Sequence, residues 1–175
     1  MITILADEKV CNLGQAISAE LAQANHDIKY FSLQNMNIKL CYACRGCEEK
    51  TYRRCIVRDD ADLILPYLVR SNTIIAVMPI TYGSYSFQMK RIIDKFALLI
   101  DIYYRYKNGE LIKGISLPGV QFYAVGVHNQ AEQAEIQAFE FLVKETLKIT
   151  DWNGKPIIVS SYSPDLSSII KEVML

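Results

Sequence analysis

The chain of 175 residues is predicted to form a doubly wound α/β fold, with five parallel strands in the order 2-1-3-4-5 and helices on both faces of the sheet. Two observations lead to this prediction. Short β-branched runs alternate with longer segments of helical periodicity, which is the pattern of repeated βαβ units. The first, third and fourth runs are almost continuously apolar, as strands are when helices cover both faces of their sheet.

The expected elements follow one another in that alternating order. We expect strands at residues 2–6, 27–33, 73–78, 120–127 and 156–162. We expect helices at residues 13–24, 59–70, 86–100 and 130–147, and a last one starting at Ser163-Pro164. Asn12 and Gln15 have the spacing of a capping box for the first helix. Pro66 should kink or shorten the second helix, because it lacks a backbone donor.

One insertion, at residues 101–119, interrupts the alternation. Three tyrosines, Tyr103, Tyr104 and Tyr106, precede an Asn108-Gly109 pair there. Asn-Gly is favoured in two-residue hairpin turns, so we expect a small hairpin. The chain is predicted to form a single domain over residues 1–175, which includes this insertion and a cysteine-rich loop at residues 38–58.

The composition narrows the class of protein. The chain has 19 basic and 19 acidic residues, so charge gives no reason to expect a nucleic-acid partner. No uninterrupted apolar run approaches the roughly 20 residues that span a bilayer. The odd number of cysteines fits a reducing compartment. We therefore expect a cytoplasmic protein whose partners are small molecules or proteins, without membrane contact.

Four cysteines, Cys41, Cys44, Cys47 and Cys55, form a C-x2-C-x2-C-x7-C array after the second expected strand. Thiolates so spaced on a loop can converge on one iron-sulfur cluster or one zinc ion. The residues alone leave three alternatives open: a [4Fe-4S] cluster, reduced and unligated thiols, and zinc or a redox disulfide.

The fold class predicts where a ligand binds. In a doubly wound sheet the site lies beyond the carboxyl ends of the strands, at the switch point between strands one and three. We therefore expect three ligand loops, at residues 7–12, 79–86 and 127–130. We also expect the cysteine array to lie near this switch point.

Residues 78–95, MPITYGSYSFQMKRIIDK, resemble the second flavin loop and following helix of the NADPH-dependent FMN reductase family, a flavodoxin-like family. The cysteine array with Asp59-Asp60 after it is similar to the iron-sulfur flavoprotein branch of that family. The resemblance implies bound FMN, NAD(P)H as electron donor, a small-molecule or protein acceptor, and a homodimer or higher homo-oligomer.

The resemblance also implies which residues form the site, with the flavin rather than a side chain carrying the chemistry. The implied cofactor-binding residues are Lys9, Asn12, Leu13, Pro79, Ile80, Thr81, Tyr82, Gly83, Ser84 and His128. The implied metal ligands are Cys41, Cys44, Cys47 and Cys55.

The second loop suits a flavin, whereas the first departs from the family pattern. Pro79 and Gly83 can shape a turn that presents backbone amides, and Tyr82 or Tyr85 offers a ring for stacking. In place of the family's Gly-Ser start, the first loop carries Asp7 and Glu8, whose charges oppose a phosphate unless they point away. Two hypotheses follow: an FMN-dependent NAD(P)H oxidoreductase or electron carrier, and a flavodoxin-like binding or regulatory protein that has lost its flavin.

Overall fold

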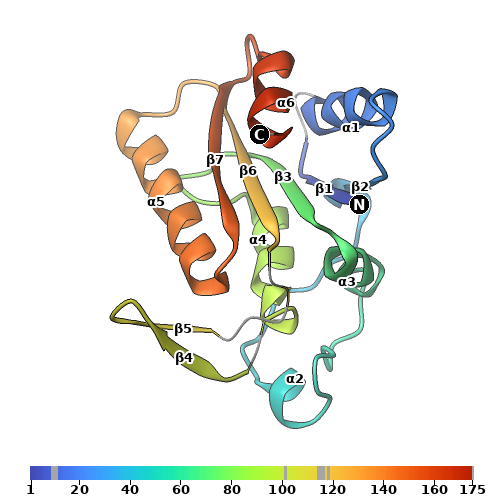
Figure 1. Ribbon diagram of the computed structural model, residues 1–175, viewed down its shortest axis with the longest axis vertical. Helices are drawn as coiled ribbons and strands as arrows, with labels where there is room; N and C mark the ends of the chain where they lie inside the picture. The colour runs from blue at the N-terminus through green and yellow to red at the C-terminus, as the bar shows by residue number, and fades with distance from the viewer. Residues whose placement is uncertain (9–11, 101, 114–116, 118, 175) are drawn as a thin grey trace.

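A parallel sheet forms the centre of the protein in the computed structural model, which describes residues 1–8, 12–100, 102–113, 117 and 119–174. Within these residues the sheet has five strands in the order β2-β1-β3-β6-β7 (Figure 1). The strands are β1 (Ile2–Ala6), β2 (Ile28–Ser32), β3 (Thr73–Pro79), β6 (Gln121–His128) and β7 (Asn153–Ser160). When these five strands are numbered 1 to 5 along the chain, their order in the sheet is the predicted 2-1-3-4-5. The predicted fold class is confirmed.

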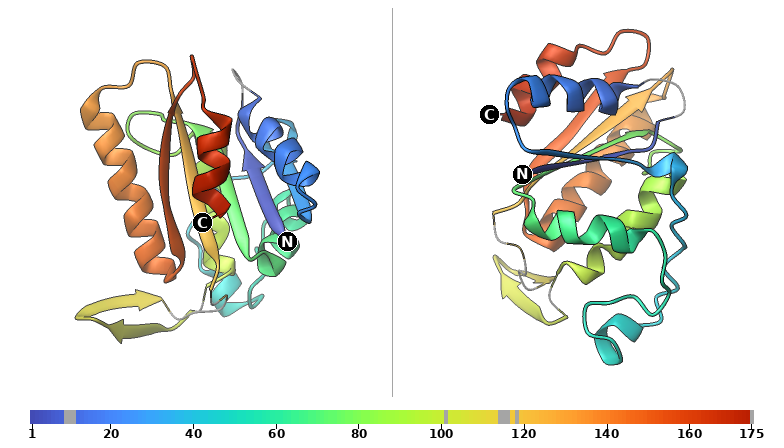
Figure 2. Two further views of the ribbon diagram at one scale, coloured as in Figure 1. Left: turned by 45° about the horizontal axis from the view of Figure 1, so that its top comes forward. Right: turned by 90° about the vertical axis from the view of Figure 1, so that its right-hand side faces the viewer.

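Helices cover both faces of the sheet, as Figure 2 shows. One face packs on α1 (Leu13–Gln23) and α6 (Leu166–Met174). The other packs on α3 (Ala61–Arg70), α4 (Phe87–Ile93) and α5 (Gln133–Thr150). Three short helices complete the set: η1 (Leu33–Asn35), α2 (Gly46–Glu49) and η2 (Asp94–Leu98). Coverage on both faces explains why the central strands are apolar throughout.

Two helices differ from their predicted lengths. The helix expected at residues 86–100 divides into α4 and the tighter 3₁₀ helix η2. Pro66 lies inside α3 without shortening it, because the helix still reaches Arg70. Ile64 and Leu68, on either side of Pro66, are completely buried against the sheet. Tertiary packing of this face therefore outweighs the lost backbone donor.

The predicted helix starts are partly wrong. The Asn12 side chain forms no capping hydrogen bond, so the expected capping box with Gln15 does not exist. The last helix begins at Leu166 rather than at Ser163-Pro164, and Asp165 accepts a bond from the Ser168 N–H at 3.1 Å. At the start of α1 the Glu8 carboxylate accepts from the Gly14 N–H, so in both helices a carboxylate satisfies a first-turn N–H group that the sequence pattern assigned to other residues.

The predicted hairpin is confirmed, with β4 (Tyr104–Lys107) paired antiparallel to β5 (Glu110–Lys113). Asn108 and Gly109 have φ angles of 52° and 85°, as a primed hairpin turn requires. The hairpin lies beside α2 of the cysteine loop, at the opposite end of the molecule from α1 and α6 (Figure 1). Lys113 Nζ lies 3.8 Å from Glu48 Oε1 and links the two segments.

Candidate functional site

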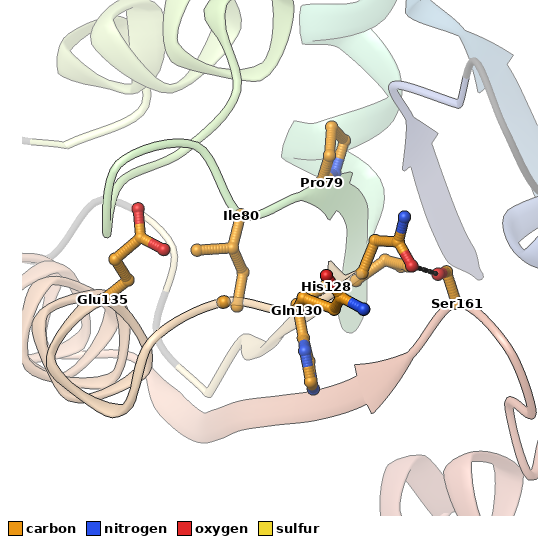
Figure 3. Close-up of a pocket in the computed structure, with 9 residues that line it drawn as sticks. Pro79, Ile80, His128, Gln130, Glu135 and Ser161 are labelled. Atoms are coloured by element: carbon orange, nitrogen blue, oxygen red, sulfur yellow. Dashed lines mark hydrogen bonds between the residues drawn. The ribbon is translucent and has the colours of Figure 1, made fainter.

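A cavity of about 420 Å³ opens at the carboxyl ends of β3, β6 and β7 (Figure 3). It is lined by Pro79, Ile80, Val127, His128, Asn129, Gln130, Ala131, Glu135 and Ser161. Of the predicted cofactor-binding residues, it brings together Pro79, Ile80 and His128. Sequence reasoning missed Ser161 and Glu135. Ser161 directly follows β7, so the rule that ligands bind beyond carboxyl strand ends could have found it.

His128 is the last residue of β6 and contributes a ring to this cavity wall. Its Nδ1 atom is buried and has no hydrogen-bond partner within the described part of the chain. Beside it, the Ser161 hydroxyl donates to Asn129 Oδ1 at 3.4 Å. A buried ring nitrogen without a partner is costly.

A tight turn adjoins the cavity just after Ile80. The Thr81 N–H donates to the Ser84 carbonyl at 3.1 Å, and the Ser84 N–H donates back to the Thr81 carbonyl at 3.0 Å. Tyr82 and Gly83 have φ angles of 49° and 70°, which define a primed two-residue turn. The Tyr82 side chain is 92% exposed. Ser86 then caps α4 by accepting from the Met89 N–H at 3.4 Å.

Glycine is required in this turn by packing as well as by backbone angle. A Cβ atom on Gly83 would lie 2.8 Å from the Cβ of Ala138 in α5 and 3.2 Å from the Glu135 carbonyl oxygen. The Ile80 N–H also donates to the Val127 carbonyl at 2.9 Å. The second and third predicted loops are therefore held against each other and against α5.

Tyr85 does not offer its ring to a ligand. Its side chain is 4% exposed and meets the Phe139 ring edge-on, with ring centroids 5.8 Å apart. Its hydroxyl shares a hydrogen bond of 2.8 Å with Thr146, and burial raises the pKa of Tyr85 to about 12. Tyr85 is thus a core residue, and of the two tyrosines considered for stacking, Tyr82 alone is exposed.

In the first predicted loop, Asp7 points into the protein. It is 4% exposed, and its N–H donates to the Val77 carbonyl at 2.8 Å. Its carboxylate accepts hydrogen bonds from the side-chain amide of Gln34 and from the hydroxyl of Ser86. Asp7 thereby ties the end of β1 to η1 and to the cap of α4, and it is not among the residues that line the cavity.

Glu8 occupies the amino end of α1. Its carboxylate accepts from the Gly14 N–H and interacts with the N–H groups of Leu13 and Gln15. The Tyr30 hydroxyl approaches it at 3.5 Å. Burial raises the pKa of Glu8, although these hydrogen bonds act in the opposite direction.

The remaining predicted residues of this loop are placed as follows. Asn12 is exposed, and Leu13 is buried in the core, so only the backbone of Leu13 faces the helix end. Lys9 lies outside the described residues.

The cysteine loop does not lie at the ligand edge. Its helix α2 is at the opposite end of the molecule from the loop that joins β6 to α5, so the expected position near the switch point is wrong (Figure 1). Aspartates close the base of the loop: Asp59 accepts from the Lys39 N–H and Asp60 from the Asn37 N–H, both at 2.7 Å. The hydrophobic periodicity of the sequence does not predict these contacts, because they join two irregular segments of the chain.

Within the described residues, no group of three or more His, Cys, Asp or Glu side chains is arranged to hold a metal ion. Cys41 and Cys44 are exposed, while Cys47 and Cys55 are half-buried. Burial raises the pKa of the Cys47 thiol, as do the neighbouring Glu48, Cys41 and Cys55. As arranged, the thiols do not fit a cluster or a zinc ion, and their role as metal ligands stays a prediction.

Fold and site together define a flavodoxin-like α/β protein with a ligand edge at the carboxyl ends of its strands. The chain belongs to the NADPH-dependent FMN reductase family, whose model matches residues 9–149. The resemblance found in residues 78–95 is thereby confirmed. Among the described residues, no helix combines the length and apolar character needed to cross a membrane.

Similar proteins include two named as iron-sulfur flavoproteins. The one from Methanosarcina thermophila is 29% identical over 106 residues, which are 61% of this chain and 50% of that protein. The one from Archaeoglobus fulgidus is 24% identical over 107 residues, which are 61% of this chain and 53% of that protein. The chain thus spans about half the length of the curated relatives it matches.

Solved structures extend the likeness to the whole fold. An azoreductase from Bacillus anthracis aligns with a TM-score of 0.66 and 10% identity, over 99% of this chain and 91% of that one. Reduced Megasphaera elsdenii flavodoxin aligns with a TM-score of 0.57 and 12% identity, over 99% and 95%. At such low identity these likenesses show the fold alone.

Proposed function

We propose that this chain is an FMN-dependent NAD(P)H oxidoreductase or flavoprotein electron carrier. One observation carries the proposal: the Thr81–Ser84 bridge shapes a rigid turn beside an open cavity, where the fold class places ligands. Membership in the NADPH-dependent FMN reductase family supports it. The names of the iron-sulfur flavoproteins agree with redox chemistry.

The turn is suited to the polar edge of an isoalloxazine ring. The N–H groups of Tyr82 and Gly83 donate to no described backbone carbonyl, so they are free to bond flavin carbonyl groups. The exposed Tyr82 ring can stack on an aromatic ligand. His128 would meet the ligand from the third loop. A bound flavin would accept hydride from NAD(P)H and pass electrons on, while the chain supplies orientation and hydrogen bonds.

A flavin titration tests this proposal. The purified protein should bind FMN, and NADPH added without oxygen should bleach the oxidised flavin band near roughly 450 nm. Gly83→Val should weaken binding, because it disturbs the turn and its packing on α5. Gly109→Val is the matched control, since Gly109 also has a positive φ but lies in the distant hairpin. A colourless protein that fails to bind added FMN would exclude the proposal.

For the cysteines, we propose a [4Fe-4S] cluster bound by Cys41, Cys44, Cys47 and Cys55. The names of the relatives support this proposal. Because the described thiols do not converge, the loop would have to close around the cluster. Anaerobic purification with iron and sulfide analysis tests this. Cys44→Ala should lower the iron content, and unchanged iron would refute the cluster.

We also propose a homodimer, which light scattering would detect.

A flavin-free binding or regulatory protein is the second candidate. The position of Glu8 on the amino end of α1 favours it, because an internal carboxylate lies where an anionic ligand group would bind. The FMN titration separates the two candidates.

A further inference from the structure

Within the described part of the chain, each of the first four N–H groups of α1 has an acceptor. The N–H groups of Leu13, Gly14 and Gln15 face the Glu8 carboxylate, and the Ala16 N–H donates to the Asn12 carbonyl at 2.9 Å. Such first-turn N–H groups are otherwise unsatisfied and make helix starts favourable for anions. Here the anion belongs to the chain itself.

The surroundings of Glu8 hold the carboxylate in this place. The Tyr30 hydroxyl, from β2, approaches it at 3.5 Å. Gly14 leaves the necessary room, because a Cβ at this position would lie 2.8 Å from the Ala6 Cβ and 3.4 Å from Glu8 Oε1. Two separate elements, β2 through Tyr30 and α1 through its first N–H groups, therefore contact this one carboxylate.

A phosphate group would have to displace this carboxylate. In doubly wound folds the phosphate of a nucleotide ligand binds at a helix start that follows a strand, where free N–H groups and the helix dipole favour negative charge. Glu8 already uses those N–H groups, and the buried Asp7 carboxylate directly precedes it in the chain. A dianion brought to this position meets like charge, which costs free energy.

We propose that Glu8 is a specificity-determining residue that takes the place of the ligand phosphate, so that the site does not favour FMN over a flavin without phosphate. The proposal rests on the proposed function, in that a flavin binds at this edge of the sheet. It assigns the ligand class more narrowly, as a flavin held through its ring and sugar chain, with riboflavin as the simplest example.

Flavin titrations of matched variants test the assignment. Wild type should bind riboflavin at least as tightly as FMN. Glu8→Ala vacates the helix start and should shift the ratio of the two dissociation constants toward FMN by about tenfold or more. Glu8→Gln removes only the charge and should give a smaller shift in the same direction. Glu20→Ala, an exposed carboxylate in the same helix, should leave the ratio unchanged. A wild type that binds FMN more tightly than riboflavin, or a Glu8→Ala ratio equal to that of wild type, would overturn the assignment.

A second measurement needs no flavin. Thermal unfolding in inorganic phosphate is compared with unfolding in chloride at the same ionic strength. Phosphate should raise the Tm of Glu8→Ala but not that of wild type. If neither variant binds any flavin, this comparison decides: selective stabilisation of Glu8→Ala upholds the role of Glu8 while the proposed flavin function fails. Equal effects on both proteins, including no effect on either, would then refute the role of Glu8.

Discussion

The ammonium group of Lys95 forms an ion pair with the carboxylate of Asp59, and the two side chains are only 2% and 1% exposed. Asp59 also accepts from the backbone N–H groups of Lys39 and Ala61, at 2.7 and 2.9 Å. The pair thus joins η2 to both ends of the cysteine loop. Breaking one side of a buried ion pair leaves an uncompensated charge, so this contact should matter for stability.

Asp59→Ala should therefore destabilise the protein by about 3 to 5 kcal/mol, because Lys95 stays buried without its partner. Adding Lys95→Met to Asp59→Ala should recover part of that loss. Asp94→Ala is the control, since Asp94 pairs with Lys90 at the surface and should cost no more than about 1 kcal/mol. Urea denaturation measures all three. Equal losses for Asp59→Ala and Asp94→Ala would contradict the prediction.

The same pair should make stability depend on acid pH. Burial alone would raise the pKa of Asp59, but the bonds from Lys95, Lys39 and Ala61 outweigh burial and lower it below the ordinary 3.8. The stabilisation is thus present above that value and is lost as pH falls through the lower, folded-state pKa. Urea midpoints between about pH 6 and pH 2 should fall more steeply in wild type than in Asp59→Ala/Lys95→Met. Parallel curves would show that Asp59 is not responsible.

Gly83→Ala should destabilise the protein more than Gly109→Ala. Both residues have positive φ, which costs an alanine roughly 1 to 2 kcal/mol. At Gly83 the new methyl group also meets Ala138 and the Glu135 carbonyl, whereas nothing lies within 4 Å at Gly109. Overpacking adds about 1 to 3 kcal/mol. Thermal or urea unfolding of the two variants compares them directly, and losses of the same size would argue against close packing on α5.

Tyr85 should ionise well above the ordinary pKa of a tyrosine, 10.0. Burial raises its pKa from the ordinary 10.0 to about 12. Because the pKa of Tyr85 is higher in the folded than in the unfolded protein, the free energy of unfolding is unaffected by this group below pH 10. It falls as pH rises from 10 toward 12, since the unfolded protein then releases the proton more readily. Ultraviolet titration of phenolate should show a late-titrating tyrosine that disappears in Tyr85→Phe.

Asp151 should hold the hairpin against the end of α5. Its carboxylate pairs with Arg105, and Lys107 Nζ lies 2.5 Å from its Oδ1 atom. Asp151→Asn should weaken both pairs while tolerating the φ of 54° at this position, because asparagine adopts left-handed backbone readily. Limited trypsin digestion should then cut the hairpin faster. Asp62→Asn, which affects a pair with Arg58 elsewhere, should leave that rate unchanged.

The βαβ alternation and the hairpin could be predicted from the sequence, because strand and helix periods and the Asn108-Gly109 turn are local properties. The strand order followed from the fold class that this alternation indicates. The sequence also predicted a ligand loop after β3, since carboxyl strand ends meet at one edge of a parallel sheet, and Pro79 and Ile80 of that loop line the cavity. The sequence did not show in which direction the individual side chains at that edge point.

The burial of Tyr85 and Asp7 and the position of Glu8 at the amino end of α1 depend on tertiary contacts. The physical reason is that partners distant in sequence orient a loop side chain: Gln34 and Ser86 bond Asp7 from 27 and 79 positions away. From the sequence, a carboxylate is known only as a negative charge. Its burial and its donors, which decide whether it repels a ligand or replaces one, exist only once the chain has folded.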